Sequence, residues 1–126
     1  MKRLYLIGGP MGVGKTAVCR ELQRRLERSV FLDGDWCWDA HPFQVTEETK
    51  AMVMENICFL LNCFLRCSAY DHVIFGWVLH RQAVLDELRS RLHLEGCRVR
   101  AVSLVASPEA LAARMEADVR AGRRDR

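Results

Sequence analysis

The segment from Gly9 to Thr16 reads Gly-Pro-Met-Gly-Val-Gly-Lys-Thr and directly follows the apolar run Leu4–Ile7. It satisfies the pattern G-x-x-x-x-G-K-[S/T] at every fixed position. Glycines let the backbone turn its N–H groups toward a phosphate, the lysine adds positive charge, and the hydroxyl can ligate magnesium. We therefore predict a nucleoside triphosphate site formed by Gly9, Pro10, Met11, Gly12, Val13, Gly14, Lys15 and Thr16, with Lys15 on the phosphates and Thr16 on the metal.

The surroundings of this segment match what a phosphate-binding loop requires. A short apolar run precedes it, as expected for a buried parallel strand, and an amphipathic helical pattern follows it. Glycine turns without a ligand also join strands to helices, but such a turn gives no reason for Lys15 and Thr16 at its end. The residues of the loop do not distinguish ATP from GTP. Of the two, Mg-ATP is the ligand we expect.

Strands and helices are expected to alternate along the chain. This alternation predicts an α/β fold, a doubly wound parallel sheet of about four strands with flanking helices in three layers. No linker interrupts the pattern, so a single domain over residues 1–126 is expected. The expected strands are Leu4–Ile7, Val30–Leu32, His72–Trp77 and Val99–Val105.

Apolar side chains at helical spacing mark the helices between the strands. Thr46 is the expected N-cap of the second helix, and the aperiodic segment Trp36–Val45 before it is expected to be loop. A further helix is expected to start at Ser107-Pro108-Glu109. The expected buried stripes are Val18, Cys19, Leu22 and Leu26; Val53, Ile57, Leu60, Leu61 and Phe64; and Val84, Leu85, Leu88 and Leu92.

Two aspartates follow the second expected strand in the segment Asp33-Gly34-Asp35. The carboxyl ends of parallel strands meet at one edge of a sheet, so both carboxylates are expected beside the segment Gly9–Thr16. One carboxylate there can hold magnesium while the other accepts a proton from, or orients, an attacking hydroxyl. The alternative is an Asp-Gly-Asp turn stabilised by side-chain to backbone hydrogen bonds.

These segments together resemble the small P-loop kinases, the group of P-loop NTPases that includes shikimate, gluconate and adenylate kinases and the chloramphenicol phosphotransferases. Gly9–Thr16 is similar to their opening motif, and Leu32-Asp33-Gly34-Asp35 is similar to the Asp-x-Asp segment of shikimate and gluconate kinases. The resemblance spans nearly the whole chain and implies a nucleotide-kinase-like fold. It also implies that Asp33 lies near magnesium and that Asp35 faces the acceptor hydroxyl.

Members of this group close an arginine-bearing lid over the phosphates, and the matching region lies near residues 112–126. The resemblance implies that Arg120, Arg123 or Arg124 neutralises charge on the transferring phosphoryl group. A solvated basic helix end is the alternative. Compared with the group, the chain is expected to be truncated inside its lid, and Val73–Trp77 ends without the aspartate that many P-loop enzymes use as a second metal ligand.

Composition limits the remaining possibilities. A net charge of +3 gives no general nucleic-acid field, and the arginine-rich end is the only feature that favours such a partner. No secretory signal or membrane-spanning run is visible, which favours a cytoplasmic protein. The cysteines lack zinc-ligand spacing, so we expect them to be free thiols. The oligomeric state is not predicted.

The sequence thus predicts an ATP-binding kinase that transfers the γ-phosphoryl group to an unidentified small-molecule or nucleotide acceptor, with ATP and Mg²⁺ as cofactors. Its expected catalytic residues are Lys15, Asp35, Arg120, Arg123 and Arg124, and its expected metal ligands are Thr16 and Asp33. The alternative function is a nucleotide-binding regulatory module, or degenerate kinase, that transfers nothing. Four aromatic residues and His80 fall on loops or strand ends near the expected acceptor side, and core packing is favoured over acceptor stacking for each aromatic one: Trp36, Trp38, Phe43 and Trp77. His41 and His80 are candidates for positioning the acceptor rather than for general base catalysis.

Overall fold

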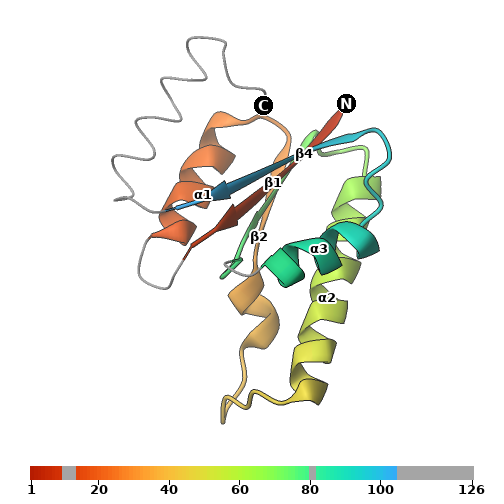
Figure 1. Ribbon diagram of the computed structural model, residues 1–126. Coiled ribbons are helices and arrows are strands. Elements are labelled where there is room, and N and C mark those ends of the chain that lie inside the picture. Colours follow the sequence, from red (N-terminus) through yellow and green to blue (C-terminus); the bar gives the residue numbers. More distant parts are fainter. Residues whose placement is uncertain (10–13, 80–81, 105–126) are drawn as a thin grey trace.

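The computed structural model describes residues 1–9, 14–79 and 82–104, which form a parallel sheet covered by helices (Figure 1). The four strands are β1 (Lys2–Gly8), β2 (Ser29–Asp33), β3 (His72–Gly76) and β4 (Cys97–Ser103). They pair in the order β2-β3-β1-β4, and every pair is parallel. The predicted α/β fold with about four parallel strands is therefore confirmed.

Strand β1 lies between β3 and β4 and carries apolar side chains on both faces. Leu4 and Leu6 pack in one core cluster, while Tyr5 and Ile7 pack in a second cluster on the opposite face. Because a central parallel strand is covered on both sides, it needs a continuous apolar run rather than an alternating one. The burial of both faces explains why the apolar run Leu4–Ile7, directly before the glycine-rich segment, contains no polar residue.

Helices cover both faces of the sheet, as the three-layer expectation requires. Helix α1 (Lys15–Arg25) packs on one face, while α2 (Glu47–Arg66) and α3 (Gln82–Arg91) pack on the other (Figure 1). The expected stripe of α1 is buried in full. In α2 and α3 the stripe is buried in part, and its outer members are half-buried: Leu60, Phe64, Val84 and Leu85.

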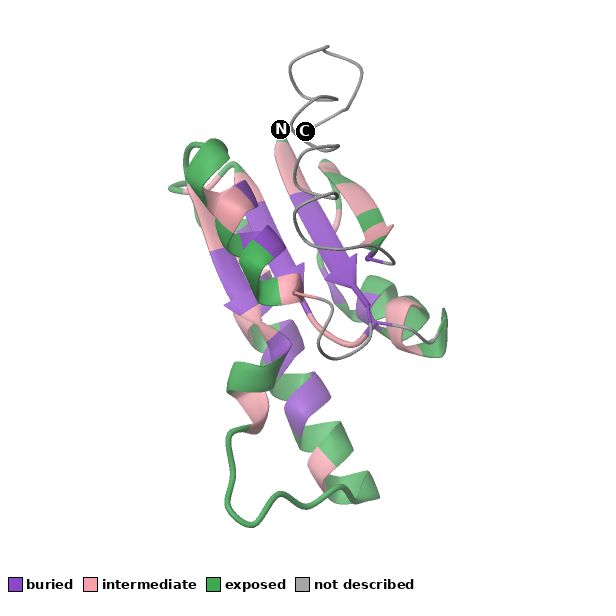
Figure 2. Cartoon of the chain, turned by 90° about the vertical axis from the view of Figure 1, so that its left-hand side faces the viewer, coloured by how far each residue is buried: buried purple, intermediate pink, exposed green. Residues whose placement is uncertain are grey.

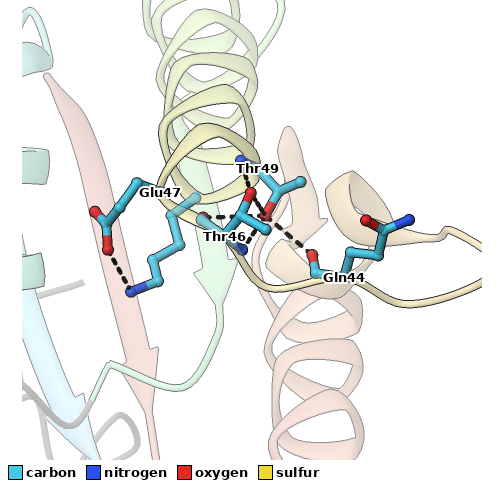
Figure 3. A network of polar contacts seen from close by, with 5 residues as sticks. Gln44, Thr46, Glu47 and Thr49 are labelled. Atoms are coloured by element: carbon cyan, nitrogen blue, oxygen red, sulfur yellow. Dashed lines mark hydrogen bonds and ion pairs between the residues drawn. The ribbon is translucent and has the colours of Figure 1, made fainter.

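The predicted N-cap of α2 at Thr46 is confirmed, and it is part of a reciprocal capping box that the sequence analysis did not predict. Thr46 Oγ1 accepts a hydrogen bond from the backbone N–H of Thr49, and Thr49 Oγ1 accepts one from the N–H of Thr46 (Figure 3). Thr49 also donates its hydroxyl to the backbone carbonyl of Gln44, at 2.9 Å. Reciprocal bonds of this kind satisfy N–H groups that a helix start leaves unpaired and fix the direction from which the chain enters.

The segment after β2 differs from the prediction. Trp36–Val45 is expected to be loop, but its first residues belong to a 3₁₀ helix, η1 (Gly34–Trp38). The turn is set by Asp33, whose side chain accepts a hydrogen bond from the N–H of Asp35. A single turn of helix is too short to produce a hydrophobic period, so pattern analysis cannot find it.

Candidate functional site

Helix α1 begins beside the carboxyl end of β1 with an open N-terminus. Gly14 has φ 88° and ψ 32°, a left-handed conformation that costs glycine little. Within the described residues, no side chain caps this end of the helix. Backbone N–H groups of the first turn, together with the positive end of the helix dipole, therefore face the space where an anion would bind.

A hydrogen bond joins the first turn of α1 to the end of β2. Thr16 Oγ1 donates to Asp33 Oδ2 at 3.0 Å, while Asp33 Oδ1 accepts from the N–H of Asp35 at 2.9 Å. The turn that was the alternative interpretation of the Asp-Gly-Asp segment is therefore present, and its carboxylate also contacts α1. The metal role of Asp33 and the acceptor role of Asp35 stay predictions. A hydroxyl beside a carboxylate is an oxygen donor set of the kind that Mg²⁺ prefers.

A cavity of about 250 Å³ lies at this edge of the sheet. It brings together Lys15 and Thr16 from α1 and Asp33 and Asp35 from the end of β2 and the start of η1. The other described residues that line it are Gly14, Phe31 and Gly76. Three residues at the end of the glycine-rich segment, Gly14, Lys15 and Thr16, thus lie at the same cavity as Asp33 and Asp35.

Phe31 and Gly76 line this cavity although the sequence analysis did not select them. Phe31 precedes Asp33 by two residues, so the two side chains lie on the same face of β2. Gly76 ends β3 and is in register with Asp33 on one side and with Ile7 on the other. Strand period and register are signals that would have found both once the strand order was known.

The base of the cavity is closely packed. A Cβ placed on Gly76 would lie 2.8 Å from Cys19 Sγ, so only glycine lets α1 approach β3 this closely. Cys19 is fully buried, and burial, followed by the negative charge of Asp33, raises the pKa of its thiol to about 12. Cys19 is therefore a neutral packing residue at physiological pH, not a nucleophile.

Three side chains beside the cavity form a stack that links α1 to η1. The guanidinium of Arg20 lies 5.0 Å from the ring centroid of Phe31 and 5.4 Å from that of Trp36. The two rings meet edge to face at 5.2 Å. Cation–π contacts of this kind hold Trp36 against α1 and thereby help to fix the adjacent Asp35.

The aromatic residues expected on the acceptor side divide into two groups. Trp77 is half-buried and packs over Gly34, where an added Cβ would lie 2.4 Å from the indole Cγ. Trp38 is also half-buried against the core. Trp36 and Phe43 remain exposed, by 50% and 61%, with the Phe43 ring 5.1 Å from that of Trp38.

Some predicted site residues lie outside the described part of the chain. These are Pro10, Met11, Gly12 and Val13 of the glycine-rich segment, His80, and the arginines Arg120, Arg123 and Arg124. The helix expected from Ser107 and the lid region near residues 112–126 lie outside it as well. Their roles stay predictions.

The family assignment follows from a comparison of the whole sequence with protein families. A model described as an AAA domain matches residues 6–125, which include the complete glycine-rich segment. The chain belongs to this family of P-loop NTPases. No curated protein matches the sequence significantly.

Solved structures of small P-loop kinases share the fold. A mutant of the APS kinase of Mycobacterium tuberculosis superposes on this chain with a TM-score of 0.67 and 13% sequence identity. The superposition covers 94% of this chain and 97% of the kinase chain. A gluconokinase of Sinorhizobium meliloti 1021 superposes with a TM-score of 0.60 and 20% identity, over 94% of this chain and 65% of the gluconokinase chain. The M. tuberculosis APS kinase has also been solved in complex with AMPPNP and APS. That structure superposes on this chain with a TM-score of 0.62 and 18% identity, and the superposition covers 98% of this chain and 76% of the kinase chain. At these identities the similarity establishes a P-loop kinase-like fold.

One further result concerns membranes. Among the described residues, no helix is both long enough and apolar enough to cross a lipid bilayer.

Proposed function

We propose that the protein binds Mg-ATP and transfers its γ-phosphoryl group to a hydroxyl of a small acceptor. The observation that carries this proposal is the convergence of Lys15, Thr16, Asp33 and Asp35 around one cavity, with Thr16 hydrogen-bonded to Asp33. The kinase-like fold and the AMPPNP bound by an APS kinase support it.

Each of these residues has a distinct role in the proposal. Lys15 and the N–H groups at the start of α1 bind the phosphates. Thr16 and Asp33 would hold Mg²⁺, which when bound neutralises phosphate charge. Asp35 lies exposed at the cavity and orients the attacking hydroxyl. It accepts the proton of that hydroxyl as the new bond to the γ-phosphorus forms and the bond from this phosphorus to the β–γ bridging oxygen breaks, with ADP as the leaving group. Arg120, Arg123 or Arg124 supplies further positive charge to the transferring group.

The experiment has a binding arm and a transfer arm. Calorimetry measures Mg-ATP binding by the wild type and by Lys15→Ala, and mass spectrometry of a metabolite pool detects ATP-dependent addition of phosphate. We expect Lys15→Ala to weaken binding by at least about ten-fold. Asp35→Asn should retain binding but lose most of the transfer activity, while Glu95→Gln, an exposed control at the opposite edge of the sheet, should behave as wild type. No binding of any nucleoside di- or triphosphate by the wild type would refute the proposal.

A nucleotide-binding module without transfer is the second candidate, because β3 ends in Gly76 where many P-loop enzymes carry a second carboxylate. ADP formation separates the two functions. ADP that appears only when an acceptor is added supports the kinase, whereas tight Mg-ATP binding without turnover across the whole pool supports the module.

A further inference from the structure

The segment that carries Asp35 is mostly exposed. Figure 2 shows that β1 and β3 are largely buried, whereas the chain from η1 to the start of α2 is largely open to solvent. Asp35 itself is exposed at the cavity. Because an exposed side chain is not fixed by packing around it, the position of the Asp35 carboxylate depends on what holds the backbone on each side of it.

One contact of α1 holds the chain before Asp35. Thr16 Oγ1 donates to Asp33 Oδ2 at 3.0 Å, and Asp33 Oδ1 accepts from the backbone N–H of Asp35 at 2.9 Å. Two hydrogen bonds through one carboxylate therefore connect the first turn of α1 to the backbone of Asp35.

A second contact of α1 holds the chain after Asp35. The guanidinium of Arg20 lies 5.4 Å from the ring centroid of Trp36 and 5.0 Å from that of Phe31, and the two rings meet edge to face at 5.2 Å. Arg20 is also held on its own helix, because it donates to Oε1 of Gln23 at 3.0 Å. Since Trp36 directly follows Asp35, this stack restrains the turn on the far side of the carboxylate.

The spacing of the two contacts makes them a two-point clamp. Thr16 and Arg20 are four residues apart, so they lie on the same face of α1. Asp33, the N-cap of η1, and Trp36 are three residues apart, and side chains at that spacing in a 3₁₀ turn lie above one another. Two side chains of one helix face thus contact two side chains of one turn, with Asp35 between them.

We propose that Arg20 is a positioning residue for phosphoryl transfer and acts through Trp36 on Asp35. This inference rests on the proposed function, in which Asp35 orients the attacking hydroxyl. Helix α1 then serves both halves of the site: its N-terminus binds the phosphates, and the face with Thr16 and Arg20 holds the group that directs the acceptor toward them. Loss of the Arg20 contact frees one side of the turn, and small displacements of a positioning group lower the rate of the chemical step steeply.

Steady-state kinetics of the full chain, with ATP and the acceptor found in the metabolite pool, separate positioning from binding. We expect Arg20→Met to lower kcat by about five-fold or more, while KM for ATP and the dissociation constant for Mg-ATP stay within about two-fold of the wild type. Arg20→Lys keeps a cation over the rings and should recover most of the lost kcat. Arg24→Met is the matched control and should behave as wild type, because Arg24 lies one turn further along α1, has a side chain that is 71% exposed, and pairs with Glu21.

Two further variants test the route from Arg20 through Trp36 to Asp35. Trp36→Leu removes the ring and should lower kcat to a similar extent, and Arg20→Met should add little in that background because the contact is already lost. Arg20→Met should also change the residual rate of Asp35→Asn by less than about two-fold, since the carboxylate that it positions is absent. A loss of folded protein would instead lower the rate in every background, and urea denaturation of each variant measures that contribution.

The outcomes separate this inference from the proposed function. A wild-type kcat in Arg20→Met, or a loss of the same size in the Asp35→Asn background, overturns the inference while the kinase activity stands. A raised KM for the acceptor at unchanged kcat would mean that Arg20 binds the acceptor, and the inference would also fail. A wild type that binds Mg-ATP but forms no ADP with any acceptor of the pool refutes the proposed transfer, and the inference falls with it.

Discussion

The hydroxyl of Thr16 donates to Asp33 Oδ2 across 3.0 Å and joins the first turn of α1 to the end of β2. These residues are separated by most of one helix and one strand in the sequence. Their contact follows from the parallel sheet, because β1 and β2 both end at the edge where α1 begins.

The first prediction concerns the charge of Asp33. Asp33→Asn keeps an oxygen that can accept from the N–H of Asp35 but removes the negative charge beside Thr16. We expect the dissociation constant for ATP in magnesium buffer to rise by about ten-fold, because a neutral amide is a poorer ligand for Mg²⁺. Calorimetry with magnesium and with EDTA measures the effect. Equal losses in both buffers would argue against a metal role.

The second prediction concerns the packing of Trp77 on Gly34. In Gly34→Ala the new Cβ would lie 2.4 Å from the indole Cγ, so the ring or the start of η1 must move. We expect a loss of about 1–3 kcal/mol in the free energy of unfolding, measured by urea denaturation. Trp77→Leu offers a smaller partner. If Gly34→Ala costs as much in that background as in the wild type, the indole is not the cause.

The third prediction concerns the stack of Arg20 on Phe31 and Trp36. Arg20→Met keeps a long side chain but removes the cation, and should lower the free energy of unfolding by about 0.5–1 kcal/mol. Arg20→Lys retains the positive charge and should lose less. Urea denaturation of both variants provides the comparison, and identical losses would indicate that packing alone, not cation–π attraction, holds Trp36.

The fourth prediction concerns the pH dependence that Cys19 causes. Burial raises the pKa of its thiol from 9.0 to about 12, so the folded state retains a proton that the unfolded state releases. The contribution of Cys19 to stability is complete below pH 9 and is lost as the pH rises from 9 toward 12. Urea denaturation at pH 8 and pH 10 should show a smaller loss for Cys19→Ala than for the wild type. Equal losses would contradict the shift.

Much of the fold could be predicted because its elements are defined by local patterns. The apolar run before Gly8, the helical stripe of α1 and the cap at Thr46 all depend on neighbouring residues, and all are confirmed. Asp33 could be placed near Thr16 because parallel strands end at one edge. That rule holds for a parallel sheet whatever the order of its strands.

The remaining features depend on contacts between distant segments. The short turn of η1 is fixed by one side-chain hydrogen bond, which no periodicity reveals. The roles of Phe31 and Gly76 in the cavity follow from the register of β2 and β3, and that of Arg20 from a contact between α1 and η1. Such contacts are set by the assembled sheet and helices rather than by residue type.

The central position of β1 also affects how the molecule can open. The strand that leads into the phosphate-binding segment has a hydrogen-bonded partner on each side, so it cannot detach unless both ladders break together. Local fluctuations should therefore release the outer strand β2, with Asp33 and Asp35, before they disturb the base of the glycine-rich segment. Slow amide exchange at Leu6 and faster exchange at Leu32 would reveal such a hierarchy, in which Asp33 and Asp35 belong to the more mobile half of the site.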